Sequence, residues 1–353
     1  MKKLVSYISF TLLAFVVSCI DPIEVNIDRE LNVLIVEGAI TTQPGPHFIS
    51  LKRSAKYGNI FEGFVRPVNS AEVIIRDSDG NNVYLKENVT PDGYKTGVYA
   101  TPADFRAEVG KSYTLLISTP FGVDYSSIPQ KVIPAAPIDT LLPVFTKRLV
   151  AENTYSSGLN VYAVFKDNPE ERNFYLWKNN GTYKIITYPE NFMARDGEGN
   201  PIPAPKDCCK DCWVDEVTDN SIRLLADNNV NGNTVTDLAA FIEDDGVRYT
   251  EKYLIRIEQH TLSREAFEFF NLLREQMSIN GDIFDPPPAT LRGNMINLNK
   301  PDEPVIGFFR VSDVSVDSLF LTPEMLDEPK PLRQINDDCR LYKQGSTEQP
   351  SYW

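Results

Sequence analysis

Residues 71–87 read AEVIIRDSDGNNVYLKE, which has the form of a strand, a tight turn and a returning strand. Ala71, Val73 and Ile75 fall on one face, and this period of two is typical of a half-buried strand. Asp79-Gly80 follows, a pair that accepts the positive φ angles of a two-residue hairpin turn. The stretch therefore predicts a β-hairpin at the centre of a β-rich region.

The segments on both sides of this hairpin repeat its pattern. Short β-branched or alternating runs recur about every 10–15 residues with turn signals between them, a spacing typical of an immunoglobulin-like β-sandwich. Pro129, Pro134 and Pro137 then follow. Because proline fixes φ and has no N–H donor, we place the end of this domain near Pro134. The strands expected within the sandwich of residues 31–134 are 31–40, 48–53, 71–76, 83–87, 97–99, 113–118 and 123–127.

The rest of the chain, residues 135–353, is expected to form a second β-rich domain with one amphipathic helix. Asn179-Asn180-Gly181 lies between two apolar runs and predicts a hairpin turn. Further on, apolar residues recur at helical spacing over 263–280, with Ser263 as the N-cap. The fold class predicted for the whole chain is therefore mainly β. The residues expected on the inner face of the strand before the helix are Tyr253, Ile255 and Ile257.

The N-terminus has the features of an exported lipoprotein. Two lysines precede an apolar run of about 14 residues, which suits a signal peptide and is too short to span a bilayer. The run ends in Val17-Ser18-Cys19, which resembles the lipobox of bacterial lipoproteins. That resemblance implies a signal peptide at 1–18, a diacylglycerol on the sulfur of Cys19, and a lipidated tether at 19–30. The expected location is the outer membrane, lipid-anchored and facing the cell surface.

Composition narrows the classes of function. Lys and Arg number 35 against 49 Asp and Glu, a formal net charge of −14, which disfavours binding to nucleic acid. The two histidines, His47 and His260, have no telling Ser, Asp or Cys partner in the sequence, and we expect His260 to cap or pack. The sequence therefore identifies no catalytic residue, no metal ligand and no cofactor other than the lipid on Cys19.

Four cysteines remain once Cys19 carries a lipid: Cys208, Cys209, Cys212 and Cys339. An even number in an exported protein favours two disulfides. Because a bond between adjacent cysteines is strained, we expect one of Cys208 and Cys209 to pair with Cys212 and the other with Cys339. That pairing would fasten the C-terminal tail to the Pro-rich loop. The alternatives are a four-cysteine zinc site and a redox Cys-x-x-Cys pair. A zinc ribbon needs two Cys-x-x-Cys pairs, and the sequence has one. A redox pair needs a thioredoxin-like βαβ context, which the sequence does not show.

Several local patterns occur in an order that resembles a known family. The chain is similar to the Bacteroidota lipoprotein family catalogued as domain of unknown function forty-two forty-nine. The resemblance implies an outer-membrane lipoprotein, often encoded beside a TonB-dependent receptor, and no catalytic residue to transfer. The patterns are Ile20-Asp21-Pro22-Ile23-Glu24, Val36-Glu37-Gly38-Ala39-Ile40-Thr41, Gly97-Val98-Tyr99, Val109-Gly110-Lys111-Ser112-Tyr113, Cys208-Cys209-x-x-Cys212-Trp213, Phe284-Asp285-Pro286-Pro287-Pro288, Gly293-Asn294, Gly307-Phe308-Phe309 and Tyr352-Trp353.

These observations favour a non-enzymatic binding or accessory subunit of an outer-membrane complex, with a β-barrel such as a TonB-dependent receptor as its partner. A structural or adhesive surface protein is one alternative, and a surface glycan-processing enzyme is another. We expect the second domain to carry the partner surface, because its long loop is stiffened by prolines and disulfides. The candidate anchors are the aromatic residues Trp213, Phe284, Tyr352 and Trp353.

The predicted lipidation of Cys19 can be tested directly. Substituting Cys19→Ala removes the only sulfur at the junction after the apolar run, so we expect the protein to lose its lipid. Metabolic labelling with a radioactive fatty acid measures this directly, with Cys339→Ser as the matched cysteine control. Persistent label in Cys19→Ala would show that the lipobox interpretation is wrong.

Overall fold

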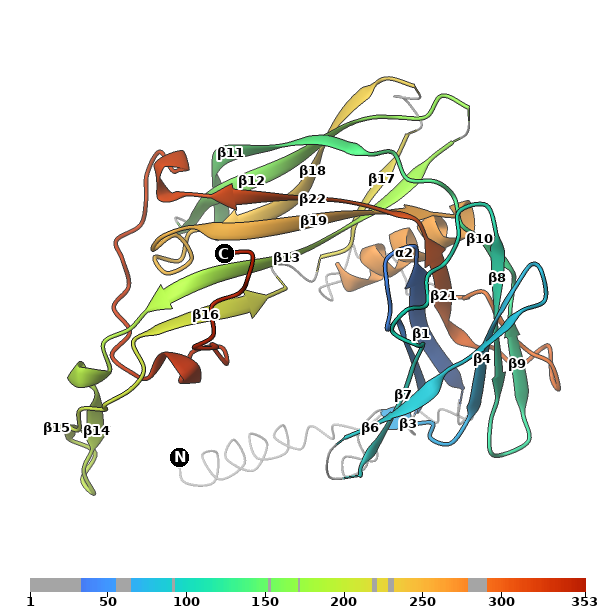
Figure 1. Ribbon diagram of the computed structural model, residues 1–353, viewed down its shortest axis with the longest axis horizontal. Helices are drawn as coiled ribbons and strands as arrows, with labels where there is room; N and C mark the ends of the chain where they lie inside the picture. The colour runs from blue at the N-terminus through green and yellow to red at the C-terminus, as the bar shows by residue number, and fades with distance from the viewer. Residues whose placement is uncertain are drawn as a thin grey trace, which may run out of the picture.

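The computed structural model describes residues 33–54, 65–90, 93–151, 154–170, 172–217, 221–227, 232–278 and 291–353. Over these residues the chain is mainly β and carries one α-helix, which confirms the predicted fold class. Figure 1 shows two β bodies side by side, with the helix between them. No helix in this part of the chain is long and apolar enough to cross a bilayer. The signal peptide, Cys19 and the tether lie outside the described residues.

The first body consists of two six-stranded sheets whose inner faces enclose one apolar core. The first sheet has the order β21-β1-β2-β7-β6, with β3 paired to β2, and the second has the order β20-β9-β8-β4-β5, with β10 paired to β8. The strands of the first sheet are β1 (Leu34–Thr41), β2 (Phe48–Ser54), β3 (Val65–Pro67), β6 (Lys86–Val89), β7 (Lys95–Ala100) and β21 (Ile306–Ser312). Those of the second are β4 (Glu72–Asp77), β5 (Asn82–Tyr84), β8 (Ser112–Ser118), β9 (Asp124–Ser127), β10 (Gln130–Lys131) and β20 (Met295–Asn297).

The hairpin predicted from residues 71–87 is present as β4 and β5. Val73 and Ile75 point into the core, as the alternation requires. One carboxylate oxygen of Asp77 accepts hydrogen bonds from the backbone N–H groups of Asp79 at 3.0 Å and Asn81 at 2.8 Å. Gly80 adopts a φ of +88°, so the Asp-Gly turn forms as its chemistry predicts.

Two strands from late in the chain complete this body. β20 pairs with β9 at the edge of one sheet, and β21 pairs in parallel with β1 at the edge of the other. Residues 295–312 therefore belong in space with the strands that precede Pro134, although more than 150 residues of sequence separate them. The immunoglobulin-like form of this sandwich stays a prediction.

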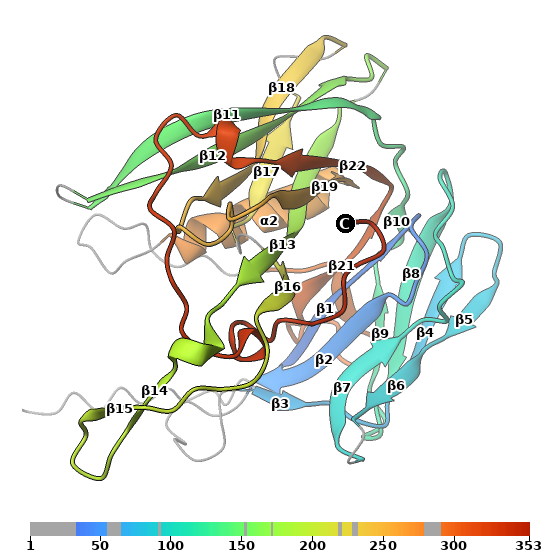
Figure 2. The same ribbon diagram turned by 60° about the vertical axis from the view of Figure 1, so that its left-hand side comes forward.

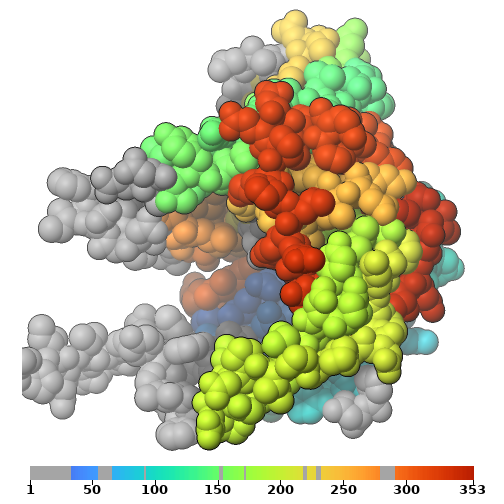
Figure 3. Space-filling view, turned by 90° about the vertical axis from the view of Figure 1, so that its left-hand side faces the viewer, coloured from blue at the N-terminus to red at the C-terminus, as the bar shows by residue number. Residues whose placement is uncertain are grey.

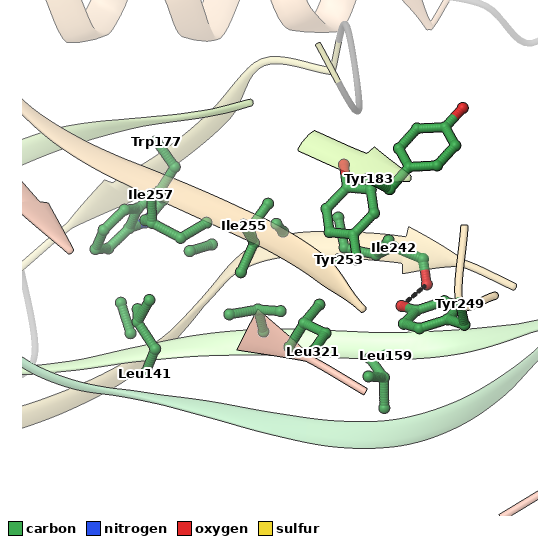
Figure 4. Close-up of a cluster of buried hydrophobic side chains, with 14 of the residues drawn as sticks. Leu141, Leu159, Trp177, Tyr183, Ile242, Tyr249, Tyr253, Ile255, Ile257 and Leu321 are labelled. Carbon is green, nitrogen blue, oxygen red and sulfur yellow. Dashed lines mark hydrogen bonds between the residues drawn. The ribbon is translucent and has the colours of Figure 1, made fainter. Parts of the chain in front are cut away.

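The second body packs a three-stranded sheet against a five-stranded one. In Figure 4, Trp177, Tyr253 and Ile255 of the larger sheet face Leu141 and Leu159 of the smaller one across the core. The smaller sheet contains β11 (Ile138–Ala151), β12 (Thr154–Lys166) and β18 (Thr234–Glu243). The larger has the order β16-β13-β19-β22 with β17 paired to β13, and comprises β13 (Phe174–Ile186), β16 (Asp211–Glu216), β17 (Arg223–Ala226), β19 (Tyr253–Leu262) and β22 (Val314–Leu321).

The predicted hairpin at Asn179-Asn180-Gly181 is wrong. β13 continues straight through these residues and pairs with β19 from Phe174 to Tyr183. Gly181 does not form a turn. It allows the ring of Tyr253 to pack closely, because a Cβ atom at this position would overlap that ring. A glycine inside a strand often marks such an approach. The predicted inner face of β19, with Tyr253, Ile255 and Ile257, is confirmed.

The single described α-helix, α2 (Arg264–Met277), confirms the helix predicted over 263–280. The Ser263 hydroxyl accepts from the N–H of Ala266 at 3.2 Å, as expected of an N-cap. Glu265 lies in the first turn and Arg274 in the last, where each charge complements the helix dipole. The apolar side of α2 packs on β13, β19 and β21, and thus contacts both bodies (Figure 2).

Both disulfides are present, but the expected pairing is wrong. Cys208 bonds to Cys209, and Cys212 bonds to Cys339. The alternation of β16 explains the second bond, because Cys212 faces the core at the place where Cys339 is also fully buried. The tail is thereby fastened to β16 of the larger sheet, whereas the expected anchor point was the Pro-rich loop. The remaining short elements are the hairpin of β14 (Met193–Arg195) and β15 (Pro201–Pro203), and the 3₁₀ turns η1 (Pro189–Asn191), η2 (Pro323–Met325) and η3 (Cys339–Leu341).

Gly307 provides a test of how β21 joins the first body. Its φ is +98°, and a Cβ atom there would collide with the backbone oxygen of Val36 on β1. We expect Gly307→Ala to lower the free energy of unfolding by about 2–4 kcal/mol, from the left-handed backbone and the clash together. Urea unfolding measures this, with Gly197→Ala as the matched control because that glycine has open space around it. Equal stability of the two variants would contradict the pairing of β21 with β1.

Candidate functional site

A cavity of about 1030 Å³ lies between the two bodies. Its walls come from β1, β2 and β21 of the first body, from β13 and β19 of the second, and from α2. In Figure 3 the molecule is hollowed on one face, and blue and orange residues lie at the depth of the hollow. The volume lies just above the range of about 300–1,000 Å³ that is usual for small-molecule sites. The cavity is therefore the candidate functional site.

Strand β21 supplies one wall through simple alternation. Phe309 and Val311 point into the core of the first body, so Phe308 and Arg310 point to the other side, into the cavity. Arg310 is only 3% exposed, in a strand whose other residues are apolar or small. A fully buried arginine without an acid is uncommon, since long charged side chains are seldom buried unless they are paired.

Strand β19 supplies the opposite wall in the same way. Its odd-numbered residues face the core of the second body, while Arg256, Glu258 and His260 face the cavity. The pairing with β13 places Lys178 directly opposite Glu258. Lys178 also lines the cavity. Five ionisable side chains, those four and Arg310, thus meet in one place.

The ion pairs in this group leave two cations without a carboxylate in direct contact, although the charge of Glu258 attracts both. Glu258 accepts from Arg256 Nε at 3.2 Å and contacts His260 Nε2 at 3.0 Å. Arg310 donates to the Ser312 hydroxyl at 2.8 Å. Among the described residues, no carboxylate oxygen lies within 4.0 Å of Lys178 or Arg310. In a chain with a net charge of −14, this is a local excess of positive charge.

The pKa values reflect this crowding of charge. The positive charge of Arg310 is the main cause that lowers the pKa of Lys178 to about 8, and partial burial adds to it. Lys178 itself stays accessible to solvent, so the charge of Arg310 is the cause that matters. Burial, followed by the charge of Arg310, lowers the pKa of His260 to about 4. The hydrogen bond with His260 lowers the pKa of Glu258 to about 2. At neutral pH, His260 is thus neutral and Glu258 is ionised.

Both histidines of the chain line the cavity, and each has a ring nitrogen without a hydrogen-bond partner. These atoms are His260 Nδ1 and His47 Nε2, both buried. Burial also lowers the pKa of His47. The expectation that His260 packs or caps was incomplete, since its ring faces a cavity and bonds to a carboxylate.

The rest of the cavity wall is mostly apolar, with Glu37, Thr41, Gln43 and Ser50 as further polar residues. Glu37 already pairs with Lys52 at 3.3 Å. Helix α2 contributes Phe269, Phe270 and Leu273, and β21 contributes Phe308. The rings of Phe269 and Phe308 lie 5.3 Å apart between centroids, which fixes the helix against the strand. The cavity therefore has a cationic end and an apolar side.

The predicted partner residues lie elsewhere, on the C-terminal tail and β16. Tyr352 is 53% exposed, and its hydroxyl lies 3.1 Å from that of Thr182 on β13. Trp353 packs edge-on against Phe320 at 5.9 Å. Trp213 is half-buried and pairs with Ser346 of the tail through two backbone hydrogen bonds, at 2.7 and 2.8 Å.

The structure thus brings Trp213, Tyr352 and Trp353 to the tail-covered end of the larger sheet. Phe284 lies outside the described residues. Sequence analysis did not single out Arg310, Lys178 or Glu258. The signal that was available is the lone arginine in the apolar run IGFFRVS of residues 306–312.

The titration of His260 gives a testable pH dependence. Because its pKa is near 4 in the fold and near 6.5 in the unfolded chain, its contribution to stability is complete above pH 6.5 and is lost as the pH falls towards 4. From pH 7.5 to 5.5 we expect the wild type to lose about 1 kcal/mol more than His260→Gln, which keeps a donor for Glu258. Urea unfolding at both pH values measures the difference. An equal loss in the two proteins would contradict a neutral His260.

No curated protein matches the chain closely enough to count as a relative. A solved structure titled "Biofilm associated protein - B domain" aligns over 83% of this chain and 86% of that chain, at 7% identity and a TM-score of 0.16. At that score the likeness carries no argument. One family model matches residues 20–318, which cover α2, the whole cavity wall and all strands except the end of β22. The chain therefore belongs to the family described as a domain of unknown function (DUF4249).

Proposed function

We propose that this protein is a non-enzymatic, lipid-anchored binding protein of the outer membrane. It acts as an accessory subunit of an outer-membrane complex, with a β-barrel such as a TonB-dependent transporter as its partner. The junction at Ser18-Cys19 and the resemblance to Bacteroidota lipoproteins support the location. The structural observation that carries the proposal is the aromatic surface formed by the C-terminal tail.

That surface, the tail surface, consists of Trp213, Phe320, Tyr352 and Trp353 with the cation Lys252. The Lys252 ammonium lies 4.1 Å from the ring centroid of Phe320 and 4.7 Å from that of Trp353. Aromatic side chains held in place in this way lose little entropy when they bind a partner. Aromatic residues also contribute most of the binding energy at many protein interfaces.

The chain holds the tail surface in a fixed position. The disulfide Cys212–Cys339 joins residues 127 apart in the sequence, and the backbone pair of Trp213 with Ser346 follows it towards the C-terminus. In the chain-entropy model such a disulfide contributes about 4–5 kcal/mol. A tail that is covalently fastened on a sheet face in this way supports a role in recognition.

The proposal is tested by affinity capture of the full-length lipoprotein from detergent-solubilised outer membranes of its own host. We expect the wild type to retain a stoichiometric β-barrel protein, identified by mass spectrometry. The double variant Tyr352→Ala/Trp353→Ala should lose at least nine-tenths of that protein. Phe121→Ala is the matched control, because Phe121 is 75% exposed on the first body.

Each contrary result has a definite meaning. Capture of no barrel by the wild type would reject the accessory role. Equal capture by the double variant would remove the tail surface from the interface. Loss in Phe121→Ala with retention in the double variant would assign the partner surface to the first body instead.

A further inference from the structure

We propose that the cavity between the two bodies binds an anionic amphiphile, whose carboxylate or phosphate group lies between Lys178 and Arg310 and whose apolar body lies against α2. The inference goes beyond the accessory role, because it rests on the cavity walls and not on the tail surface. It assigns to this chain a small-molecule site with two parts of different chemistry.

The cationic end requires an anion. Arg310 is buried, its one hydrogen bond within the described chain goes to a neutral hydroxyl, and Lys178 approaches it from the opposite wall. Two like charges that share a site repel each other, and a buried charge without a partner is costly. Glu258 does not fully compensate the positive charges of Arg310 and Lys178, because its carboxylate already bonds to Arg256 and His260. An anionic group between the two cations would satisfy both.

Arginine and lysine together suit a carboxylate or a phosphate. The guanidinium group presents a fork of N–H donors that matches two oxygens of either anion, and the ammonium adds a point charge. Lys178 and Arg310 line the same cavity from opposite walls, and the lowered pKa of Lys178, caused chiefly by Arg310, is consistent with that placement.

The apolar side and the volume exclude a bare ion as the natural occupant. Phe269, Phe270 and Leu273 present an apolar wall, and a cavity of about 1030 Å³ is of the size that holds a drug-sized molecule. His47 Nε2 and His260 Nδ1 add two polar atoms without partners, which a hydroxyl or amide of the ligand could meet. A small number of polar groups in an apolar cavity is usual for sites that orient a ligand.

The binding experiment uses the chain from Ile20 to Trp353, which retains every described residue and omits the cysteine that would carry the lipid. Isothermal titration calorimetry with octanoate, octyl phosphate, octanamide and acetate separates the contributions of head group and apolar body. We expect octanoate or octyl phosphate to bind at least tenfold more tightly than neutral octanamide and than acetate. The better of the first two identifies the anion as carboxylate or phosphate.

Three variants locate the site. Arg310→Met should weaken the octanoate or octyl phosphate complex at least tenfold and Lys178→Met at least threefold, while neither changes the binding of octanamide. Lys147→Met is the matched control, because this exposed lysine pairs with Glu328 and does not line the cavity. It removes the same charge and should leave the affinity unchanged.

A purely structural role for Arg310 predicts a different result. If the arginine served the fold, Arg310→Met would lower the thermal midpoint, whereas removal of a buried, unpaired charge should leave it unchanged or raise it. The proposal is overturned if octanamide binds as tightly as the anions, if acetate binds as tightly as octanoate, if no probe binds, or if Arg310→Met binds like the wild type. Barrel capture by the tail surface is measured separately, so failure of one proposal does not imply failure of the other.

Discussion

The two bodies are joined most directly at the point where β21 leaves the first body and β22 enters the second, beside the contacts that α2 makes with both bodies. Asp313 stands at that point. Its carboxylate accepts from the hydroxyl of Thr42 at the end of β1 at 2.6 Å and from the N–H of Ala135 at 2.8 Å. Its own N–H donates to the hydroxyl of Thr261 on β19 at 3.0 Å. Because these partners come from β1, the Pro-rich segment and β19, the angle between the two bodies cannot change without breaking charge-assisted hydrogen bonds.

The position of the cavity follows from this junction. The sheet that contains β21 packs only one of its faces on the first core, so its other face is free to turn towards the second body. Arg310 lies three residues before Asp313, on that face, and β19 carries its charged residues on the side that faces it. The wall of the cavity is therefore made by strands whose other faces form the two cores. Such walls are rigid, which favours a pre-formed site over one assembled on binding.

The sequence predicts the local structure well and the long-range structure poorly. The β4–β5 hairpin, helix α2 and the inner face of β19 follow from turn chemistry and periodicity, and all three are present. The Asn-Gly pair before Thr182 failed as a turn signal, because packing of Tyr253 decides the role of Gly181. The hydrophobic pattern within β21 does not reveal that this strand pairs with β1, because the choice of partner strand depends on contacts between residues far apart in the sequence. The cavity is made by that pairing, so its cationic end could not be predicted, although the lone arginine in β21 was a visible anomaly.

The cavity and the tail surface occupy one face of the same sheet. Along β13, Lys178, Asn180 and Thr182 share a face because side chains alternate, and the pairing sets Asn180 beside Arg256 and Thr182 beside Leu254. Arg256, beside Asn180, lines the cavity, and Thr182 contacts Tyr352. These two positions along β13 are two residues apart, which is about 7 Å in a strand. A partner seated on the tail surface would lie beside the cavity. An uncompensated charge close to a docking surface has an electrostatic effect on what docks there, because the field in a partly buried site is weakly screened. The same two cations that favour an anion in the cavity would therefore disfavour a positively charged partner surface next to it.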